Sequence, residues 1–125
     1  MKIVIGTNDK KTINPNHFGE SRYFCVYEML MGKESSVDCR ENPFAGEHVP
    51  DKPQKIMDLL NDCDVFIIRS IGRHAFTVLP SQNKTLYLTR LTEIEDVIAK
   101  LSAGELKYFQ KFNPASGKFE MHDPD

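Results

Sequence analysis

The sequence feature that most constrains the fold is a short apolar run, Val-Phe-Ile-Ile at residues 65–68, which lies between Asp64 and Arg69. A strand that is apolar on both faces must be covered on both sides, which is typical of a central strand in a parallel sheet. Apolar residues at helical spacing, beginning at Pro53 and again near Thr92, predict helices that can cover it. The alternation of strands and helices therefore predicts an α/β fold with a mainly parallel sheet.

Alternating patterns and turn residues place the other elements. Residues 22–29 and 33–41 form a hairpin, and the charged residues along one face of its second strand predict a solvent-exposed edge. Thr92 is expected to cap a helix, with Glu95 completing a capping box and Gly104 ending the helix. The expected strands are 2–7, 22–29, 33–41, 64–69 and 84–88, and the expected helices begin at Pro53, at Arg73 and after Thr92.

Three cysteines, Cys25, Cys39 and Cys63, match neither a disulfide framework nor a CxxC metal site. If residues 31–33 form the hairpin loop, Cys25 lies opposite Cys39, with their Cβ atoms about 5 Å apart. Two small buried side chains that happen to pair are the favoured interpretation, and a redox pair or a soft metal site is the alternative. Two thiols alone make a weak metal site, because most such sites use more ligands.

Composition limits the functions that this chain can have. Its 125 residues suffice for one domain, and 16 Lys and Arg against 18 Asp and Glu give a formal net charge of -2. No field of one sign dominates, which argues against a general binder of nucleic acid or of membrane surfaces. No apolar stretch approaches the roughly 18 residues of a membrane helix, and the N-terminus lacks a secretory signal pattern, so a cytoplasmic protein is expected.

Five short segments stand out in order along the chain: KIVIGT at 2–7, HFGESRYF at 17–24, ENP at 41–43, DCDV at 62–65 and SIGR at 70–73. Together they resemble the dinitrogenase iron–molybdenum cofactor biosynthesis family, which includes carrier and chaperone proteins of nitrogen fixation. The resemblance covers a domain at residues 1–106 and leaves residues 107–125 as a C-terminal tail, either packed or flexible. It implies a ribonuclease-H-like three-layer α/β/α fold with a five-stranded mixed sheet in the order 3-2-1-4-5.

In such a sheet, strands 1 and 4 lie side by side where the chain reverses its winding, and ligands bind outside the carboxyl ends of strands at that point. The loops that meet there place the expected cofactor-binding residues in one crevice: Asn8, His17, Gly72, Arg73 and His74. His17 is the candidate metal ligand, because imidazole binds iron well; a histidine that only fixes the loop is the alternative. Arg73, at a helix N-terminus, favours an anion, and a solvated surface arginine is the alternative.

The resemblance implies a non-catalytic protein that binds or carries an iron–sulfur or iron–molybdenum cluster or its precursor, with other cofactor-assembly proteins as partners. A two-metal nuclease is not expected, because the first strand, Ile-Val-Ile-Gly at residues 3–6, lacks the carboxylate that such enzymes need. No spacing supports a Ser or Cys nucleophile with a base, so an enzyme is not expected. Two alternatives stay open: a metal-free regulatory module that binds a small anionic ligand or another small molecule, and a protein–protein interaction module.

Overall fold

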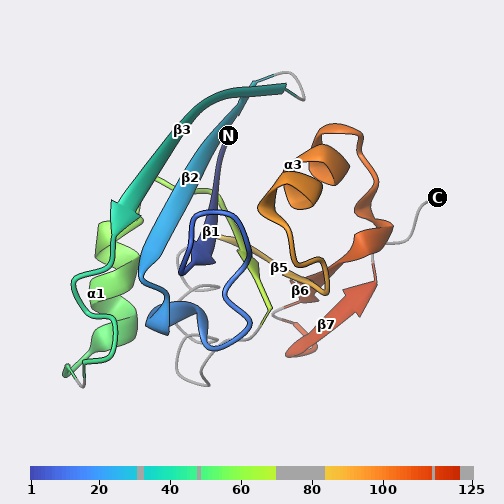
Figure 1. Ribbon diagram of the computed structural model, residues 1–125. Coiled ribbons are helices and arrows are strands. Elements are labelled where there is room, and N and C mark those ends of the chain that lie inside the picture. Colours follow the sequence, from blue (N-terminus) through green and yellow to red (C-terminus); the bar gives the residue numbers. More distant parts are fainter. Residues whose placement is uncertain (31–32, 48, 70–83, 114, 122–125) are drawn as a thin grey trace.

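The computed structural model describes residues 1–30, 33–47, 49–69, 84–113 and 115–121. Its strands form one seven-stranded sheet in the order β3-β2-β1-β4-β5-β6-β7 (Figure 1). The strands are β1 (Lys2–Thr7), β2 (Tyr23–Leu30), β3 (Lys33–Glu41), β4 (Val65–Ile68), β5 (Thr85–Thr89), β6 (Phe109–Asn113) and β7 (Lys118–Met121). The α-helices are α1 (Lys52–Leu59) and α3 (Ile94–Ser102), and the short 3-10 helices are η1 (Phe18–Glu20) and η2 (Leu106–Tyr108). Within these ranges, no helix is long and apolar enough to span a bilayer.

The apolar run forms β4, which lies between β1 and β5 and is parallel to both, as predicted. The five strands β3-β2-β1-β4-β5 follow the predicted order. The predicted strand count of five is wrong, because residues expected in the tail form β6 and β7 and continue the sheet antiparallel to β5. Phe109 of β6 is buried, with its ring centroid 5.7 Å from that of Tyr87 on β5, so these residues close an edge that β5 would otherwise expose. The helix expected from Arg73 lies outside the described residues.

Each face of the sheet carries its own hydrophobic cluster, because successive side chains of a strand point to opposite faces. On one face, α1 packs onto the sheet through Ile56 and Met57, beside Phe24 and Phe66. On the other face, α3 packs through side chains that include Val97. Figure 1 shows α1 and α3 on opposite sides of the central strands, which gives a three-layer α/β/α arrangement.

The start of α3 differs from the prediction, because Thr92 does not cap the helix. Glu93 is the N-cap residue, and its side chain makes no capping hydrogen bond. Instead, the loop after β1 supplies backbone contacts: the Ile94 N–H donates to the Lys11 carbonyl at 2.9 Å, and the Ile13 N–H donates to the Thr92 carbonyl at 2.8 Å. A tertiary contact thus satisfies a helix-end donor that a local capping side chain would otherwise satisfy.

The β2–β3 hairpin keeps the predicted pairing of Cys25 with Cys39, although its loop differs from the prediction. Lys33 pairs with Leu30 rather than lying in the loop, and an irregularity in the ladder compensates for the shorter connection. Residues 31–32, which connect the strands, lie outside the described residues.

The two paired cysteines form a disulfide, with their Cα atoms 3.9 Å apart. The interpretation of Cys25 and Cys39 as unbonded small side chains is therefore wrong. The register brings their sulfur atoms within bonding reach, but a sequence does not show whether such a pair is oxidised. Cys63 is a free, buried thiol, as predicted, and burial raises its pKa to about 12.

Candidate functional site

The parallel strands β1, β4 and β5 all end at one edge of the sheet, which we call the carboxyl edge. The register pairs Ile5 with Ile67 and Ile68 with Leu88, so the three strands end at similar levels. Since β2 runs antiparallel to β1, its first residue, Tyr23, and the preceding Arg22 also lie at this edge. The loop after β1 and the chain after β4 therefore begin side by side, as the predicted order of strands requires.

The loop after β1 folds back over the end of that strand. The Asn14 N–H donates to the Gly6 carbonyl at 2.9 Å. The side-chain amide of Asn14 donates to the His17 carbonyl and to Ser21 Oγ, each at 3.0 Å. A Cβ at Gly6 would collide with Ser21 Oγ, so a glycine is needed for this close approach.

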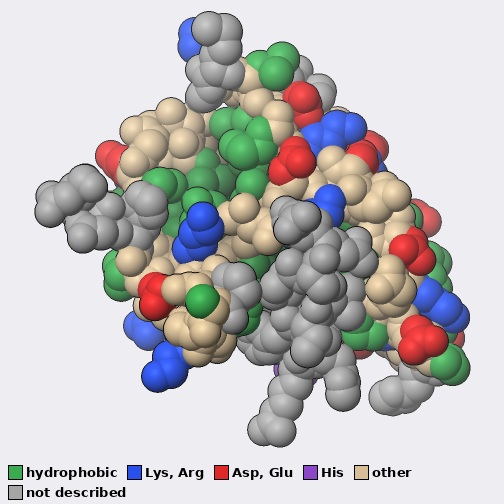
Figure 2. Space-filling model, turned by 180° about the vertical axis from the view of Figure 1, so that it is seen from behind, with side chains coloured by type: hydrophobic (Ala, Val, Ile, Leu, Met, Phe, Trp, Pro, Cys, Tyr) green, Lys and Arg blue, Asp and Glu red, His purple; other side chains and the backbone are tan. Residues whose placement is uncertain are grey.

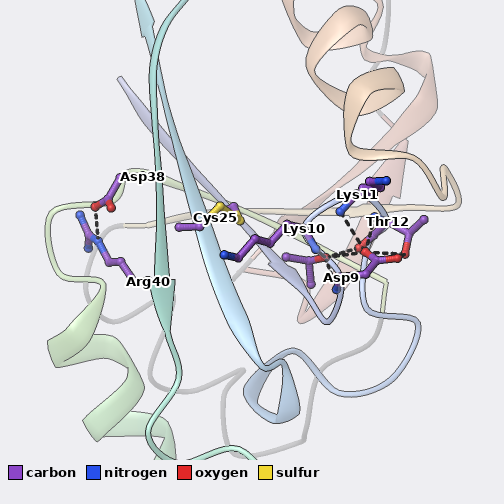
Figure 3. The surroundings of a disulfide bond; sticks show 9 residues. Asp9, Lys10, Lys11, Thr12, Cys25, Asp38 and Arg40 are labelled. Carbon is purple, nitrogen blue, oxygen red and sulfur yellow. Dashed lines mark hydrogen bonds and ion pairs between the residues drawn. A yellow bond between two sulfur atoms is a disulfide. The ribbon is translucent and has the colours of Figure 1, made fainter.

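Asp9 organises the first turn of this loop. Its carboxylate accepts hydrogen bonds from the backbone N–H groups of Thr12 at 2.7 Å and Lys11 at 2.9 Å (Figure 3). These bonds hold the pKa of Asp9 well below its usual range. The turn leaves Lys10 and Lys11 exposed.

Two of the predicted site residues, Asn8 and His17, lie in this loop. The side-chain oxygen Oδ1 of Asn8 accepts a hydrogen bond from the Arg22 backbone N–H at 3.0 Å, so Asn8 links the loop to the start of β2. His17 is exposed and precedes η1 as its N-cap residue. The other predicted site residues lie outside the described residues: Gly72, Arg73 and His74.

His17 does not lie in a ready-made ion site. No group of three or more His, Cys, Asp or Glu side chains in the described ranges could hold a metal ion. A lone imidazole can complete the coordination of a preformed cluster, which brings its own ligands, but it cannot enclose a single ion. Among the described residues, His17 therefore has no side-chain partners with which to hold a single ion.

The carboxyl edge also gathers cations that the sequence analysis did not single out. Lys10 and Arg22 both lie over the ring of Tyr23, with Nζ and Cζ at 4.6 and 5.9 Å from its centroid. Arg69 follows β4 and Arg90 follows β5. No local sequence pattern distinguishes this set from other lysines and arginines; its members are Lys10, Lys11, Arg22, Arg69 and Arg90.

We call these five residues the edge cations. In the part of the chain that the structure describes, none of them forms an ion pair. Lys2, Arg40, Lys52 and Lys100 do, whereas six further described lysines do not: Lys33, Lys55, Lys84, Lys107, Lys111 and Lys118. Elsewhere the charges are mixed: Figure 2 shows acidic and basic side chains interspersed around a hydrophobic area on the back of the molecule. The edge cations are therefore set apart by their position around the ends of the parallel strands and not by the lack of an ion pair alone.

Two hollows with cationic side chains lie near this edge. One, of about 450 Å³, is lined by Lys10, Lys11 and Tyr27 and by the start of α3, where Glu93 and Glu95 add negative charge. The other, of about 340 Å³, is lined by Arg90, Lys107 and residues around the ends of β5 and η2. Hollows lined by cations attract anionic ligands, and no acidic residue is among the described residues that line the second hollow.

Solved structures with this fold cover most of the chain. The crystal structure of PH0822 has a TM-score of 0.68 over 99% of this chain and 98% of that chain, at 21% identity. A crystal structure from Methanocaldococcus jannaschii, of a protein named as a candidate dinitrogenase, has a TM-score of 0.66 over 89% and 93%, at 17% identity. An NMR structure from Thermotoga, of a protein named as a candidate NifB protein, has a TM-score of 0.62 over 82% and 88%, at 21% identity. At such identities the likeness establishes the fold alone.

The sequence itself carries the family assignment. No curated protein matches the chain. The family model for the dinitrogenase iron-molybdenum cofactor matches residues 1–104 of the 125, which includes β1 to β5 and both α1 and α3. The chain therefore belongs to the dinitrogenase iron-molybdenum cofactor family.

Proposed function

We propose that this protein binds and carries an iron–sulfur or iron–molybdenum type cluster, or its precursor, without catalysing a reaction on it. The observation that carries this proposal is the set of edge cations at the loop that bears His17, which form no ion pair with any other described residue. Family membership supports a relation to this cofactor. The cluster is the cargo of the protein, and other cofactor-assembly proteins would deliver and receive it.

The chemistry of the edge suits an anionic cargo. Clusters held by sulfide and carboxylate ligands carry net negative charge, and that charge is stabilised by nearby cations and N–H donors. Lys10 and Arg22 lie together over Tyr23, so a ligand at this point would meet both positive charges. His17 would add one imidazole bond to a metal atom of the cluster. Gly72, Arg73 and His74 enter the proposal only from the family resemblance.

A carrier must also release its cargo, and the arrangement around His17 favours release of the cluster. A single protein ligand on an exposed loop holds a cluster less permanently than several buried ligands do. The carboxylate of Asp9 is committed to hydrogen bonds within its own turn. A carrier that does not transform its cargo needs no free acid or base at this point.

The experiment is anaerobic reconstitution with iron and sulfide, followed by iron analysis and an absorption spectrum. We expect stoichiometric iron in the wild-type protein and loss of most of it in His17→Ala. The matched control is His17→Gln, which keeps a polar loop side chain but offers no imidazole, and which should also lose iron. If both variants retain wild-type iron, His17 is not the ligand, and if the wild-type protein takes up none, the carrier proposal fails.

A second candidate is a metal-free module that binds a small anion. The hollow lined by Arg90 and Lys107 favours it, because two cations there lack an ion pair within the described residues. Titration with inorganic phosphate by calorimetry separates the two functions. Phosphate binding that Arg90→Gln abolishes, in protein that takes up no iron, would support this candidate.

A further inference from the structure

The Cys25–Cys39 disulfide lies at the edge of the sheet, between β2 and the outermost strand β3. The ladder pairs the two residues directly, with ordered pairs on both sides of them. The backbone therefore holds both sulfur atoms close together whether or not they are bonded. Such a pair can open and close without a rearrangement of the strands.

The two sulfur atoms differ in their access to solvent. Cys25 is 0% exposed, within the cluster under α3, whereas Cys39 is partly buried at the margin of that cluster. Among the described strands, β3 is the last one at this side of the sheet. In thiol–disulfide exchange, access decides which sulfur atom is attacked, so an external thiol would reach Cys39 first.

The third cysteine cannot compete with this pair. Cys63 is buried in the cluster on the opposite face of the sheet, beneath α1. The sheet thus separates Cys63 from the disulfide, and exchange within the chain is confined to Cys25 and Cys39.

A cation lies on the same face as the disulfide. Tyr23 precedes Cys25 by two residues and packs against the same cluster, and Lys10 Nζ is 4.6 Å from the centroid of the Tyr23 ring. Figure 3 shows Lys10 extending from its loop toward β2, on the side of the disulfide. A nearby ammonium group favours the thiolate form of a cysteine, and the thiolate is the reactive form.

We propose that Cys25 and Cys39 form a thiol–disulfide exchange site for low-molecular-weight thiols, with Cys39 as the attacked sulfur and Cys25 as the leaving group. An external thiolate forms a bond to Cys39 Sγ, the bond between Cys25 and Cys39 breaks, and its electron pair passes to Cys25 Sγ, which takes up a proton. A second external thiol attacks the sulfur of the bound thiol, which releases Cys39 and forms the small-molecule disulfide. In sum, two external thiols are oxidised and the protein disulfide is reduced to two thiols. The reverse sequence, with a small-molecule disulfide as oxidant, restores the bond.

The first test uses the folded wild-type protein, oxidised with glutathione disulfide and then treated with dithiothreitol in the absence of denaturant. At each time the reduction is stopped with acid, the protein is unfolded in denaturant at neutral pH with N-ethylmaleimide, and intact mass counts the adducts. We expect two new adducts, at Cys25 and Cys39, and an unchanged circular dichroism spectrum of the protein before it is unfolded. Reduction that occurs only when denaturant is present during the dithiothreitol step, or no loss of reactive thiols after oxidation, would overturn the proposal. Cys63→Ala should behave like the wild-type protein.

The second test asks which sulfur is attacked. Glutathione disulfide should modify Cys39 in Cys25→Ala at least about tenfold faster than it modifies Cys25 in Cys39→Ala, because only Cys39 is accessible. If either variant fails to fold, brief treatment of wild-type protein with reduced glutathione, followed by acid quenching and peptide mapping, locates the mixed disulfide. A mixed disulfide mainly on Cys25 would contradict the assignment of roles. Lys10→Gln should slow the exchange of the wild-type pair, and an unchanged rate would remove Lys10 from the site.

Discussion

Arg40 lies on β3 and Arg22 directly precedes the neighbouring strand β2, but the two side chains meet opposite electrostatic environments. Arg40 donates to both carboxylate oxygens of Asp62, at 2.8 and 2.7 Å, and to the Leu59 carbonyl at 3.1 Å. Lys2 donates to the same carboxylate at 3.1 Å. Arg22 lies over an aromatic ring and has no carboxylate partner among the described residues.

The difference separates two uses of positive charge. Arg40 on β3 binds the Leu59 carbonyl at the end of α1 and the carboxylate of Asp62. Its charge therefore stabilises the packing of the α1 layer on the sheet. The edge cations are left with their charge available to a ligand. Loss of the charge of Arg40 should therefore reduce the stability of the fold, whereas loss of an edge cation should reduce the binding of a ligand.

The largest expected effect follows from replacing Arg40. Arg40→Met should lower the free energy of unfolding by about 2–3 kcal/mol, because it removes several hydrogen bonds to a carboxylate and a carbonyl. Arg22→Met is the matched control, since the same substitution there breaks no ion pair, and its effect should stay within about 0.5 kcal/mol. Urea unfolding followed by circular dichroism measures both. Equal losses in the two variants would show that the contrast between the two arginines is not energetic.

The second effect concerns binding. Lys10→Gln combined with Arg22→Gln should weaken the binding of an anionic probe, tetrathiomolybdate, by about tenfold, or about 1.4 kcal/mol. Raising the salt concentration should weaken wild-type binding and have less effect on the double variant, because exposed charges are screened. Lys100→Gln, which removes a paired cation on α3, serves as the control. Wild-type affinity in the double variant would exclude these two cations from the site.

A smaller effect should appear on acidification. The Arg40 guanidinium beside Asp62 holds the pKa of that carboxyl well below its usual range. Because the folded-state pKa is the lower one, the pair stabilises the fold above the unfolded value of about 3.9, and this contribution disappears as the pH falls toward the folded-state pKa.

After allowance for solvent screening of this partly exposed pair, about 1 kcal/mol should be lost between neutral pH and pH ~3. The measurement is the difference in unfolding free energy between wild-type protein and Asp62→Asn across that range. A difference that does not change with pH would mean that Asp62 contributes no linked protonation.

The smallest effect concerns Lys2, whose ion pair with Asp62 is solvent-exposed. Lys2→Met should leave the unfolding free energy nearly unchanged, because exposed pairs are screened and mobile. A loss of unfolding free energy as large as that of Arg40→Met would show that Lys2, Arg40 and Asp62 act as one unit.

The fold was predictable where a local pattern decides the structure. The run at residues 65–68 became a central parallel strand because apolar residues on both faces leave no other stable position for it. β6 and β7 were missed because short strands with few apolar residues depend on pairing with an edge, which no local pattern shows. The cap of α3 was missed for the same reason, since its acceptor is the Lys11 carbonyl from a distant loop.

The candidate site was predictable in its location but not in its chemistry. The order of strands brings the ends of β1 and β4 together, as predicted, and so places the His17 loop at the carboxyl edge. The cations there could not be recognised, because an exposed lysine or arginine looks the same in a sequence whether or not a carboxylate neutralises it. The disulfide was not predicted, because the register of the two strands shows that Cys25 lies opposite Cys39 but does not show whether their thiols are oxidised.

The backbone contacts between the loop after β1 and the start of α3 also bear on how the protein is made. Ile13 and Ile94 each need a carbonyl from the other segment, and most of the chain lies between the two. During synthesis, the loop that carries His17 leaves the ribosome long before its partner segment exists. The candidate site therefore takes its final shape only after α3 has been synthesised and has docked, so a nascent chain that stops short of residue 94 has the loop's sequence without its geometry.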